Sequence, residues 1–190
     1  MTLEVYFITS NMHKFEEISN FINNRIIIKR AVYPLIEIQD EDIEKVAMNK
    51  LLLSNLPYDY AFVEDSGLFI KDLNGFPGVF SAYTFKTIGL EGIIKLMEGI
   101  NNRHATFVSV IAFKQKEKIL VFRGEVEGTI AFDIRGSNNF GFDPIFIPEN
   151  NKNTFGEMDI HEKSHYSHRT RAYKKFLEYV NHILDTGYPQ

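Results

Sequence analysis

The first 65 residues alternate between apolar β-prone runs and stretches of helical periodicity, and this alternation constrains the fold more than any other feature. The runs Leu3–Thr9, Arg25–Val32 and Tyr60–Val63 predict three strands. Helical spacing between them predicts two helices, one capped by Asn11 and the other by Asp40. The apolar face of the first helix is predicted to hold Phe15, Ile18, Phe21 and Ile22. A β-α-β-α-β order is typical of a sheet covered by helices, so the sequence predicts an α/β fold.

The second half is richer in strand. His104–Lys114 and Lys118–Val126 are predicted to pair antiparallel across a polar turn at residues 115–117. Helices are predicted at Ile88–Gly99 and from Ser167 to Asp185, with Gly187 ending the second. Because no repeat, low-complexity tract or Pro/Gly/Ser-rich linker interrupts the chain, we expect one domain over residues 1–190.

Composition excludes several classes of protein. A hydrophobic fraction of 44% with 14% aromatic residues can fill a core, which excludes disorder. No apolar run reaches the roughly 18 residues of a membrane span, and the N-terminus lacks the features of a signal peptide. The absence of cysteine excludes disulfides and thiolate chemistry. These features predict a cytoplasmic protein, and the net charge of -4 argues against a nucleic-acid polymer as partner.

The segment Thr9–Lys14 lies at the first strand-to-helix junction. Ligands of open α/β sheets bind beyond the carboxyl ends of strands, where a helix N-terminus offers free N–H groups to an anion. Hydroxyl and amide side chains followed by one lysine suit a polyphosphate. No Walker sequence is present, and an ordinary N-cap followed by a solvated lysine is the alternative interpretation.

Two adjacent acids, Glu64 and Asp65, end the third predicted strand and are followed by Ser66 and Gly67. A hard ion such as Mg²⁺ takes one or two carboxylates and completes its shell with phosphate oxygens. Glu37 is a lone acid between apolar residues that could reach the same ion. The alternatives are a polar turn for the acid pair and a surface charge on an edge strand for Glu37.

Three further segments carry candidate chemistry. The Gly75–Gly78 loop around a Phe-Pro pair is predicted to be rigid and to need unusual φ angles. In Phe140–Pro144, aromatic rings beside Asp143 could stack on a flat base and accept its hydrogen bonds, although such phenylalanines are more often core. The basic segment Lys163–Arg169, placed at the start of the terminal helix, calls for a compensating anion; a solvated basic turn is the alternative.

Other catalytic patterns are missing. His161, His165 and His168 are spaced four and three residues apart without a cysteine or a matching acid motif, so they predict no metal centre. A serine hydrolase is not supported because GxSxG is absent.

Taken in order, five of these segments resemble the inosine/xanthosine triphosphate pyrophosphatase family, and the total length resembles its archaeal members. The matching segments are Thr-Ser-Asn-x-x-Lys at 9–14, Glu-Asp-Ser-Gly-Leu at 64–68, Gly-Phe-Pro-Gly with Ser-Ala at 75–82, Phe-Gly-Phe-Asp-Pro at 140–144 and Ser-His-Arg at 167–169. Ser10 stands where the family commonly has glycine, and Phe142 where other members have Tyr or Trp.

The resemblance implies a two-lobed α/β fold with a long twisted mixed sheet, flanking helices and a nucleotide-binding cleft. It implies hydrolysis of ITP, dITP and XTP to the monophosphate and pyrophosphate, a need for Mg²⁺ with Mn²⁺ as the alternative, and a homodimer.

The resemblance also assigns residues. The catalytic set is Asp65, Glu64 and Lys14, with Asp65 favoured over Glu64 as the base, and Glu37 and Asp65 bind the metal. The phosphates are held by Thr9, Asn11 and Lys14, and the nucleotide is contacted by Ser66. The purine is framed by Phe140, Phe142 and Asp143, and its 6-oxo edge is reached by Lys163, His168 and Arg169. The neighbouring motif residues Ser10, Met12, His13 and Gly141 complete the predicted substrate site.

Two other functions remain open at this point. One is a pyrophosphatase of the same fold that acts on modified or pyrimidine nucleotides. The other is a nucleotide-binding sensor without turnover, which we would expect to lack one of the carboxylates Glu37, Glu64 and Asp65.

Overall fold

The computed structural model describes residues 2–19, 25–138 and 140–187, and within them it has a mixed α/β fold. Its strands are β1 Leu3–Ile8, β2 Ile26–Ala31, β3 Tyr60–Ile70, β4 Pro77–Gly78, β5 His104–Gln115, β6 Lys118–Ile130 and β7 Phe146–Pro148. Its α-helices are α1 Met12–Ser19, α2 Ile43–Leu53, α3 Ser81–Thr87, α4 Gly89–Leu96, α5 Ile160–Tyr166 and α6 His168–Thr186. Short 3₁₀ helices are η1 Lys71–Leu73, η2 Asp143–Ile145 and η3 Phe155–Glu157.

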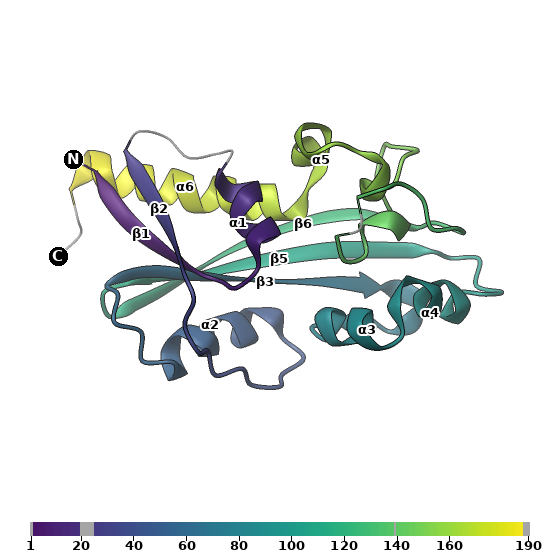
Figure 1. Ribbon diagram of the computed structural model, residues 1–190, viewed down its shortest axis with the longest axis horizontal. Coiled ribbons are helices and arrows are strands. Elements are labelled where there is room, and N and C mark those ends of the chain that lie inside the picture. The colour runs from purple at the N-terminus through teal and green to yellow at the C-terminus, as the bar shows by residue number, and fades with distance from the viewer. Residues whose placement is uncertain (1, 20–24, 139, 188–190) are drawn as a thin grey trace. The chain divides into compact units, whose positions relative to one another are not determined.

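The strands form one mixed sheet in the order β2-β1-β3-β5-β6-β7, with β4 paired to β3 (Figure 1). The chain divides into two compact units. Unit 1 comprises Met1–Asp65, Ser109–Gly124 and Arg169–Gln190, and unit 2 comprises Ser66–Val108 and Glu125–His168. Strands β3, β5 and β6 each continue from one unit into the other.

The predicted β-α-β-α-β opening is confirmed. Strand β1 pairs in parallel with both β2 and β3, as short helical crossovers allow. Helix α1 follows Asn11 directly, and the Asn11 side-chain oxygen accepts a hydrogen bond from the Lys14 backbone N–H at 3.3 Å, as a helix N-cap does. Phe21 and Ile22, predicted on the same helix, lie outside the described residues.

Two predicted boundaries in this half of the chain are wrong. Helix α2 is capped by Asp42 instead of Asp40, because the Asp42 carboxylate accepts from the Glu44 backbone N–H at 2.9 Å. Strand β3 does not end at Val63 but continues to Ile70, where it pairs antiparallel with β4. The continuation depends on Gly67, since a Cβ there would lie 2.4 Å from the Gly78 carbonyl oxygen.

The terminal helical region is also divided differently from the prediction. Ser167 has extended ψ and separates α5 from α6, so Lys163 belongs to a short helix of its own and not to the start of the terminal helix. The predicted end is confirmed, because α6 stops at Thr186 and Gly187 has a φ of 79°. The predicted helix at 88–99 is α4, preceded by the separate helix α3.

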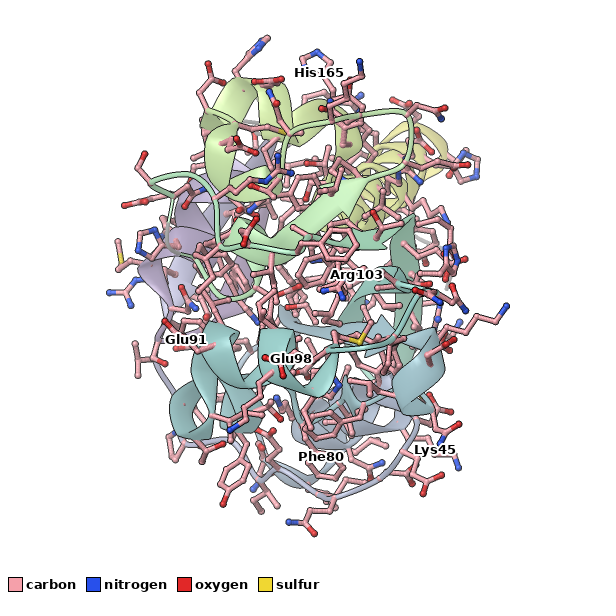
Figure 2. All side chains as sticks on the ribbon, turned by 90° about the vertical axis from the view of Figure 1, so that its right-hand side faces the viewer. Lys45, Phe80, Glu91, Glu98, Arg103 and His165 are labelled. Atoms are coloured by element: carbon pink, nitrogen blue, oxygen red, sulfur yellow. The ribbon has the colours of Figure 1, made fainter. Side chains whose placement is uncertain are left out.

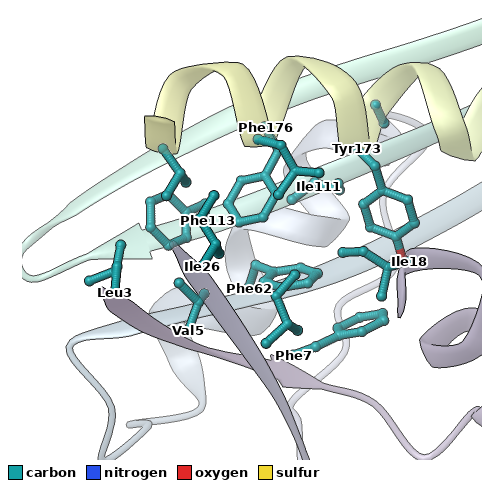
Figure 3. Close-up of a cluster of buried hydrophobic side chains, with 14 of the residues drawn as sticks. Leu3, Val5, Phe7, Ile18, Ile26, Phe62, Ile111, Phe113, Tyr173 and Phe176 are labelled. Atoms are coloured by element: carbon teal, nitrogen blue, oxygen red, sulfur yellow. The ribbon is translucent and has the colours of Figure 1, made fainter. Parts of the chain in front are cut away.

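The core of unit 1 lies between its part of the sheet and α6 (Figure 3). Phe7 of β1 stacks on Phe62 of β3 with ring centroids 4.4 Å apart, and Phe176 of α6 packs on Phe62 at 4.9 Å. Truncating such a buried phenylalanine to alanine typically costs about 3–5 kcal/mol. Phe7 and Phe62 closely precede the polar residues discussed below, which follow the carboxyl end of β1 and lie within β3.

Unit 2 has a core of its own. Phe107 of β5 contacts Phe146 of β7 and Phe155 of η3, with ring centroids 4.6 and 6.2 Å apart. The buried guanidinium of Arg103 donates to the backbone carbonyls of Ile130, Met97 and Ala131 (Figure 2). As predicted, the loop before α3 requires unusual backbone angles, with Gly75 and Gly78 at φ 87° and 54°. Within the described part of the chain, no helix is long and apolar enough to cross a membrane.

Candidate active site

Glu64 is the buried centre of a charged cluster in unit 1. Its Oε1 accepts hydrogen bonds from the Ser109 hydroxyl at 2.6 Å and from Arg169 Nε at 3.1 Å, and its Oε2 lies 2.7 Å from Lys14 Nζ. Burial alone favours the neutral acid, but the positive charges of Arg169 and Lys14 hold the pKa of Glu64 well below its usual range. Glu64 is therefore an ionised anchor for two cations.

Lys14 connects this anchor to the predicted phosphate-binding segment. Its ammonium donates a hydrogen bond to the Glu64 backbone carbonyl at 3.0 Å and forms an ion pair with Glu64 Oε2, 2.7 Å away. An ammonium has three N–H groups, so a further one can serve an anion. Thr9 and Asn11 lie at the same junction, where the Thr9 hydroxyl accepts from the Asn11 backbone N–H at 3.0 Å. The Lys14 ammonium and the polar residues Thr9 and Asn11 thus lie together at the start of α1.

Asp65 and Glu37 are brought together by Lys50. The Lys50 ammonium, on α2, lies 2.5 Å from Asp65 Oδ1 and 3.0 Å from Glu37 Oε2. Burial opposes the charged form of Lys50, yet the two carboxylates outweigh it and raise the Lys50 pKa. For Asp65, burial outweighs the neighbouring lysines and raises the pKa. The side chain of Glu37 is 64% exposed, so the pair opens to solvent on one side.

One oxygen of Asp65 is an orphan. Asp65 Oδ2 is buried and has no hydrogen-bond donor among the described residues. A buried carboxylate oxygen without a donor is costly in a stable fold and is typical of an atom that a ligand completes. Glu37 and Asp65 supply hard oxygen donors of the kind that Mg²⁺ binds, so the donor set fits a divalent ion whose shell is completed by phosphate and water. Within the described chain, no group of three His, Cys, Asp or Glu side chains forms a self-sufficient metal site.

Arg169 lies in unit 1, at the start of α6, and its side chain is 2% exposed. Its NH1 pairs with Glu17 Oε2 of α1 at 2.6 Å, while Nε contacts Glu64. The guanidinium therefore joins α1, β3 and α6 through two carboxylates. Its predicted role at the purine 6-oxo edge stays a prediction.

In unit 2, Asp143 and Lys163 form a second buried ion pair. Asp143 Oδ2 and Lys163 Nζ are 2.7 Å apart, and both side chains are 3% exposed. The ammonium also lies over the rings of Phe140 and Phe155, 5.2 and 5.7 Å from their centroids. Asp143 begins η2 and Lys163 lies on α5, so the pair joins two short helices across 20 residues.

The remaining predicted base-binding residues have different surroundings. Phe140 is half-buried, and Gly141 beside it has a φ of 55°. Phe142 is buried in the core, with its ring edge against Phe85 at 5.6 Å. His168 is also buried, and its ring stacks on Phe107 with centroids 4.5 Å apart and an interplanar angle of 6°. Of the two phenylalanines, Phe140 is half-buried and Phe142 is fully buried.

The predicted residues thus fall into two groups. Unit 1 brings Lys14, Glu37, Glu64 and Asp65 together, and unit 2 gathers Phe140, Asp143, Lys163 and His168. Of the other predicted residues, Ser66 on β3 is half-buried, and Ser10, Met12 and His13 are exposed around the first turn of α1.

Sequence reasoning missed Lys50, Glu17 and Ser109. Lys50 had a detectable signal, because it occupies an inward position of α2 at helical spacing from the buried Ile43 and Val46. A lysine on an apolar helix face needs a buried partner, and here it has two carboxylates.

The fold and these groups define a mixed α/β protein in which lysines of α1 and α2 pair with two adjacent carboxylates of β3, a class of site suited to an anion that is bound together with a cation. Residues 5–179 match the Ham1 family. The chain belongs to the Ham1 family, and the resemblance indicated by the five motifs is confirmed.

Two dITP/XTP pyrophosphatases and one solved structure are similar to nearly the whole chain. The chain is 46% identical over 183 residues to the dITP/XTP pyrophosphatase of Pyrococcus horikoshii, which covers 94% of this chain and 97% of that protein. It is 45% identical over 175 residues to the dITP/XTP pyrophosphatase of Korarchaeum cryptofilum, with 92% and 94% covered. The solved structure of a HAM1 protein from Coxiella burnetii is similar with a TM-score of 0.84 at 28% identity, covering 95% of this chain and all of that one.

Proposed function

We propose that this protein is a dITP/XTP pyrophosphatase that also accepts ITP, and that it releases the nucleoside monophosphate and pyrophosphate. Such an activity removes non-standard purine triphosphates from the nucleotide pool. The observation that carries the proposal is the unit 1 cluster, in which Lys14 and Lys50 each hold one of two adjacent carboxylates beside an orphaned buried oxygen. The Ham1 family and its dITP/XTP pyrophosphatase members supply the substrate class.

The two lysines supply charge where the reaction needs it. Negative charge grows on the bridging oxygen as pyrophosphate leaves, and fixed cations stabilise it without reorganisation. A further N–H of Lys14 can donate to a phosphate while Glu64 holds the ammonium in place. The formal charges of the cluster sum to -1, so it has fewer positive than negative charges. The sum counts three cations, Lys14, Lys50 and Arg169, and four carboxylates, Glu17, Glu37, Glu64 and Asp65.

Asp65 is the better candidate for the base that orients the attacking water. Glu64 is committed to Ser109, Arg169 and Lys14, and its pKa is held low, so it is a poor proton acceptor. Asp65 has a raised pKa and an oxygen, Oδ2, that lacks a donor. A water bonded to Oδ2 would form the new P–O bond at the α-phosphorus as the bond to the pyrophosphate oxygen breaks, and Asp65 would take its proton.

Glu37 and Asp65 would hold Mg²⁺, with Mn²⁺ as the alternative. When bound, the ion supplies Lewis-acid stabilisation of the phosphate charge. Lys50 holds both carboxylates at one point and thereby preorganises these ligands. Because Glu37 is largely exposed and belongs to a segment without regular structure, the ion and its phosphate have access from solvent.

Purine recognition is proposed for unit 2. The 6-oxo group of hypoxanthine or xanthine accepts a hydrogen bond, whereas the 6-amino group of adenine donates one. A fixed donor at this edge leaves adenine with an unpaired polar contact, which can discriminate by ~10⁴ or more. Lys163 is held by Asp143 beside the half-buried ring of Phe140, which supports a base site there. His168 of the same unit is proposed to complete it, while the role that the resemblance gives to Arg169 stays a prediction.

The test is product release from ITP, dITP, XTP, ATP and GTP with Mg²⁺. We expect pyrophosphate from the first three, slow release from ATP and GTP, and loss of turnover in Asp65→Asn. Asp133→Asn removes an exposed carboxylate and is the matched control, expected to leave rates unchanged. Orthophosphate as product, or equal rates on all purines, would refute the proposal. Activity only on modified or pyrimidine nucleotides would favour the related enzyme of the same fold, and no turnover with retained binding would favour a sensor.

We also propose a homodimer, which the resemblance implies. Around the start of α3, unit 2 exposes 44% of Phe80, which is labelled in Figure 2, and 70% of Tyr83, and a second copy could cover these two side chains. Light scattering should give twice the chain mass, and Tyr83→Glu should lower it to the chain mass.

A further inference from the structure

Helix α5 carries two exposed histidines one turn apart, at positions 161 and 165. The segment reads His-Glu-Lys-Ser-His, so an acid follows the first histidine directly. In helical zinc sites, this spacing puts two imidazoles on one face. The sequence analysis predicts no metal centre here, because spacing alone does not show how the rings lie. The structure supplies that missing information.

The separation of the two rings matches a chelate. The ring centroids of His161 and His165 are 5.0 Å apart with an interplanar angle of 66°. With metal–nitrogen bonds of about 2.0–2.1 Å, each ring centre lies about 3.2 Å from the metal, and a ligand angle near 90–110° places the two centres about 4.5–5.2 Å apart. The rings meet edge to face, and their observed separation falls in this range, so the ring spacing is compatible with one ion bound between them.

The tautomer of the His165 ring also leaves Nε2 available to a metal. Its Nδ1 lies 2.9 Å from the backbone carbonyl oxygen of His161, and because a carbonyl only accepts, Nδ1 carries the proton. The lone pair of a neutral ring is then on Nε2, which faces away from this hydrogen bond. Metal-binding histidines characteristically donate their other ring N–H to a carbonyl or carboxylate in this way.

We infer that His161 and His165 form a binding site for a divalent transition ion such as Ni²⁺, Cu²⁺ or Zn²⁺, distinct from the carboxylate site of unit 1. Imidazole nitrogen suits these ions, whereas Mg²⁺ prefers the oxygens of Glu37 and Asp65. The described residues supply no third His, Cys, Asp or Glu ligand, so solvent completes the shell and the affinity is below that of a closed structural site. For the same reason, the site is not the three-ligand centre of a metalloprotease.

A metal ion bound to these two histidines would also stabilise helix α5. Lys163 lies between the two histidines in sequence but faces inward, where its ammonium is buried against Asp143. His165 is on the surface of the molecule (Figure 2). An ion across His161 and His165 would cross-link one full turn of α5, a helix of only 7 residues, and so stabilise the turn that carries Lys163.

The test uses the full chain without an affinity tag, titrated with CuCl₂ and NiCl₂. Wild type should bind one tight equivalent of Cu²⁺ per chain, with nitrogen hyperfine structure in the electron paramagnetic resonance spectrum. His161→Gln and His165→Gln should each weaken it tenfold or more. His182→Gln, which removes an exposed lone histidine on α6, is the matched control and should bind as wild type does.

A second readout is thermal. Ni²⁺ should raise the melting temperature of wild type and of His182→Gln but not of His165→Gln. Circular dichroism should show the same helix content in all variants. The inference is overturned if either α5 variant binds Cu²⁺ as tightly as wild type, or if the His182 variant loses binding to the same extent. Failure of the proposed pyrophosphatase activity would leave this result unaffected, because the measurement needs no nucleotide.

Discussion

Replacing Arg169 with methionine is the sharpest test of how the unit 1 cluster is held together. Methionine keeps much of the aliphatic volume but removes the cation between Glu17 and Glu64, whose oxygens lie 2.6 and 3.1 Å from the guanidinium nitrogens. At an effective dielectric constant near 20, two such pairs are worth about 4 kcal/mol each before desolvation. Part of this is returned because the buried guanidinium no longer has to be desolvated.

The net cost follows from what remains. Removing one partner of a buried ion pair typically costs about 3–5 kcal/mol. Glu64 keeps Lys14 and Ser109 as partners, which places the expected loss near the lower end, at about 3 kcal/mol. With a urea m-value of about 2–3 kcal/mol/M, the unfolding midpoint should fall by about 1 to 1.5 M.

The assay is urea unfolding followed by circular dichroism, with Lys174→Gln as the control because it removes an exposed cation from the same helix. The control should change the free energy of unfolding by under about 1 kcal/mol. Adding Glu17→Gln to the Arg169 variant should cost less than it does in wild type, since the glutamate has already lost its cation. A loss below about 1 kcal/mol for Arg169→Met would refute the reasoning.

Three further predictions concern Asp65, Glu64 and Gly136. Replacing Asp65 with asparagine should lower kcat by about 10²–10⁴-fold while leaving the melting temperature within a few degrees, which steady-state kinetics and calorimetry would show together. The pKa of Glu64 is lower in the folded than in the unfolded protein, so its ionisation stabilises the fold above the unfolded pKa, and this stabilisation is lost as the pH falls toward the folded pKa. The free energy of unfolding should therefore fall from about pH 5 down to about pH 2, and Glu64→Gln should reduce the slope of this fall. Gly136→Ala should lower the free energy of unfolding by more than about 2 kcal/mol, because its φ is 92° and a Cβ would lie 2.0 Å from the Gly156 backbone; urea unfolding checks it against Gly99→Ala, where a Cβ meets no atom within 4 Å.

Local signals predicted the elements that depend on local chemistry. Asn11 before an apolar-periodic segment is a strong cap signal, and the alternation of buried and half-buried residues in β1 follows from its sequence. Gly187 ends α6 because a positive φ is cheap only for glycine. The wrong end of β3 depended on other segments of the sheet, whereas the wrong cap of α2 was a choice between two nearby aspartates. Strand β3 lies between β1 and β5 and pairs with β4 at Leu68 and Phe69, and the acid-rich sequence does not reveal these neighbours.

The sequence predicted individual residues of the candidate site but not the contacts between them. Lys14, Glu64 and Asp65 could be singled out because charged groups at the end of an apolar strand have few structural uses. The partners of Glu64 lie 45 and 105 residues away, at Ser109 and Arg169, and no local pattern links them. Lys50 was detectable only as a polar residue on a helix face that should be apolar. Whether a charge ends in solvent or in a buried pair is decided by tertiary packing.

In the proposed reaction, water attacks the α-phosphorus of a non-standard purine triphosphate with help from Asp65. Hydrolysis of dITP and XTP in ¹⁸O-labelled water, analysed by mass spectrometry of both products, tests it most directly. We expect one ¹⁸O atom in the nucleoside monophosphate, none in the pyrophosphate, and labelled product that forms about 10²–10⁴-fold more slowly with Asp65→Asn. Label in the pyrophosphate, or unchanged turnover by the variant, would contradict it.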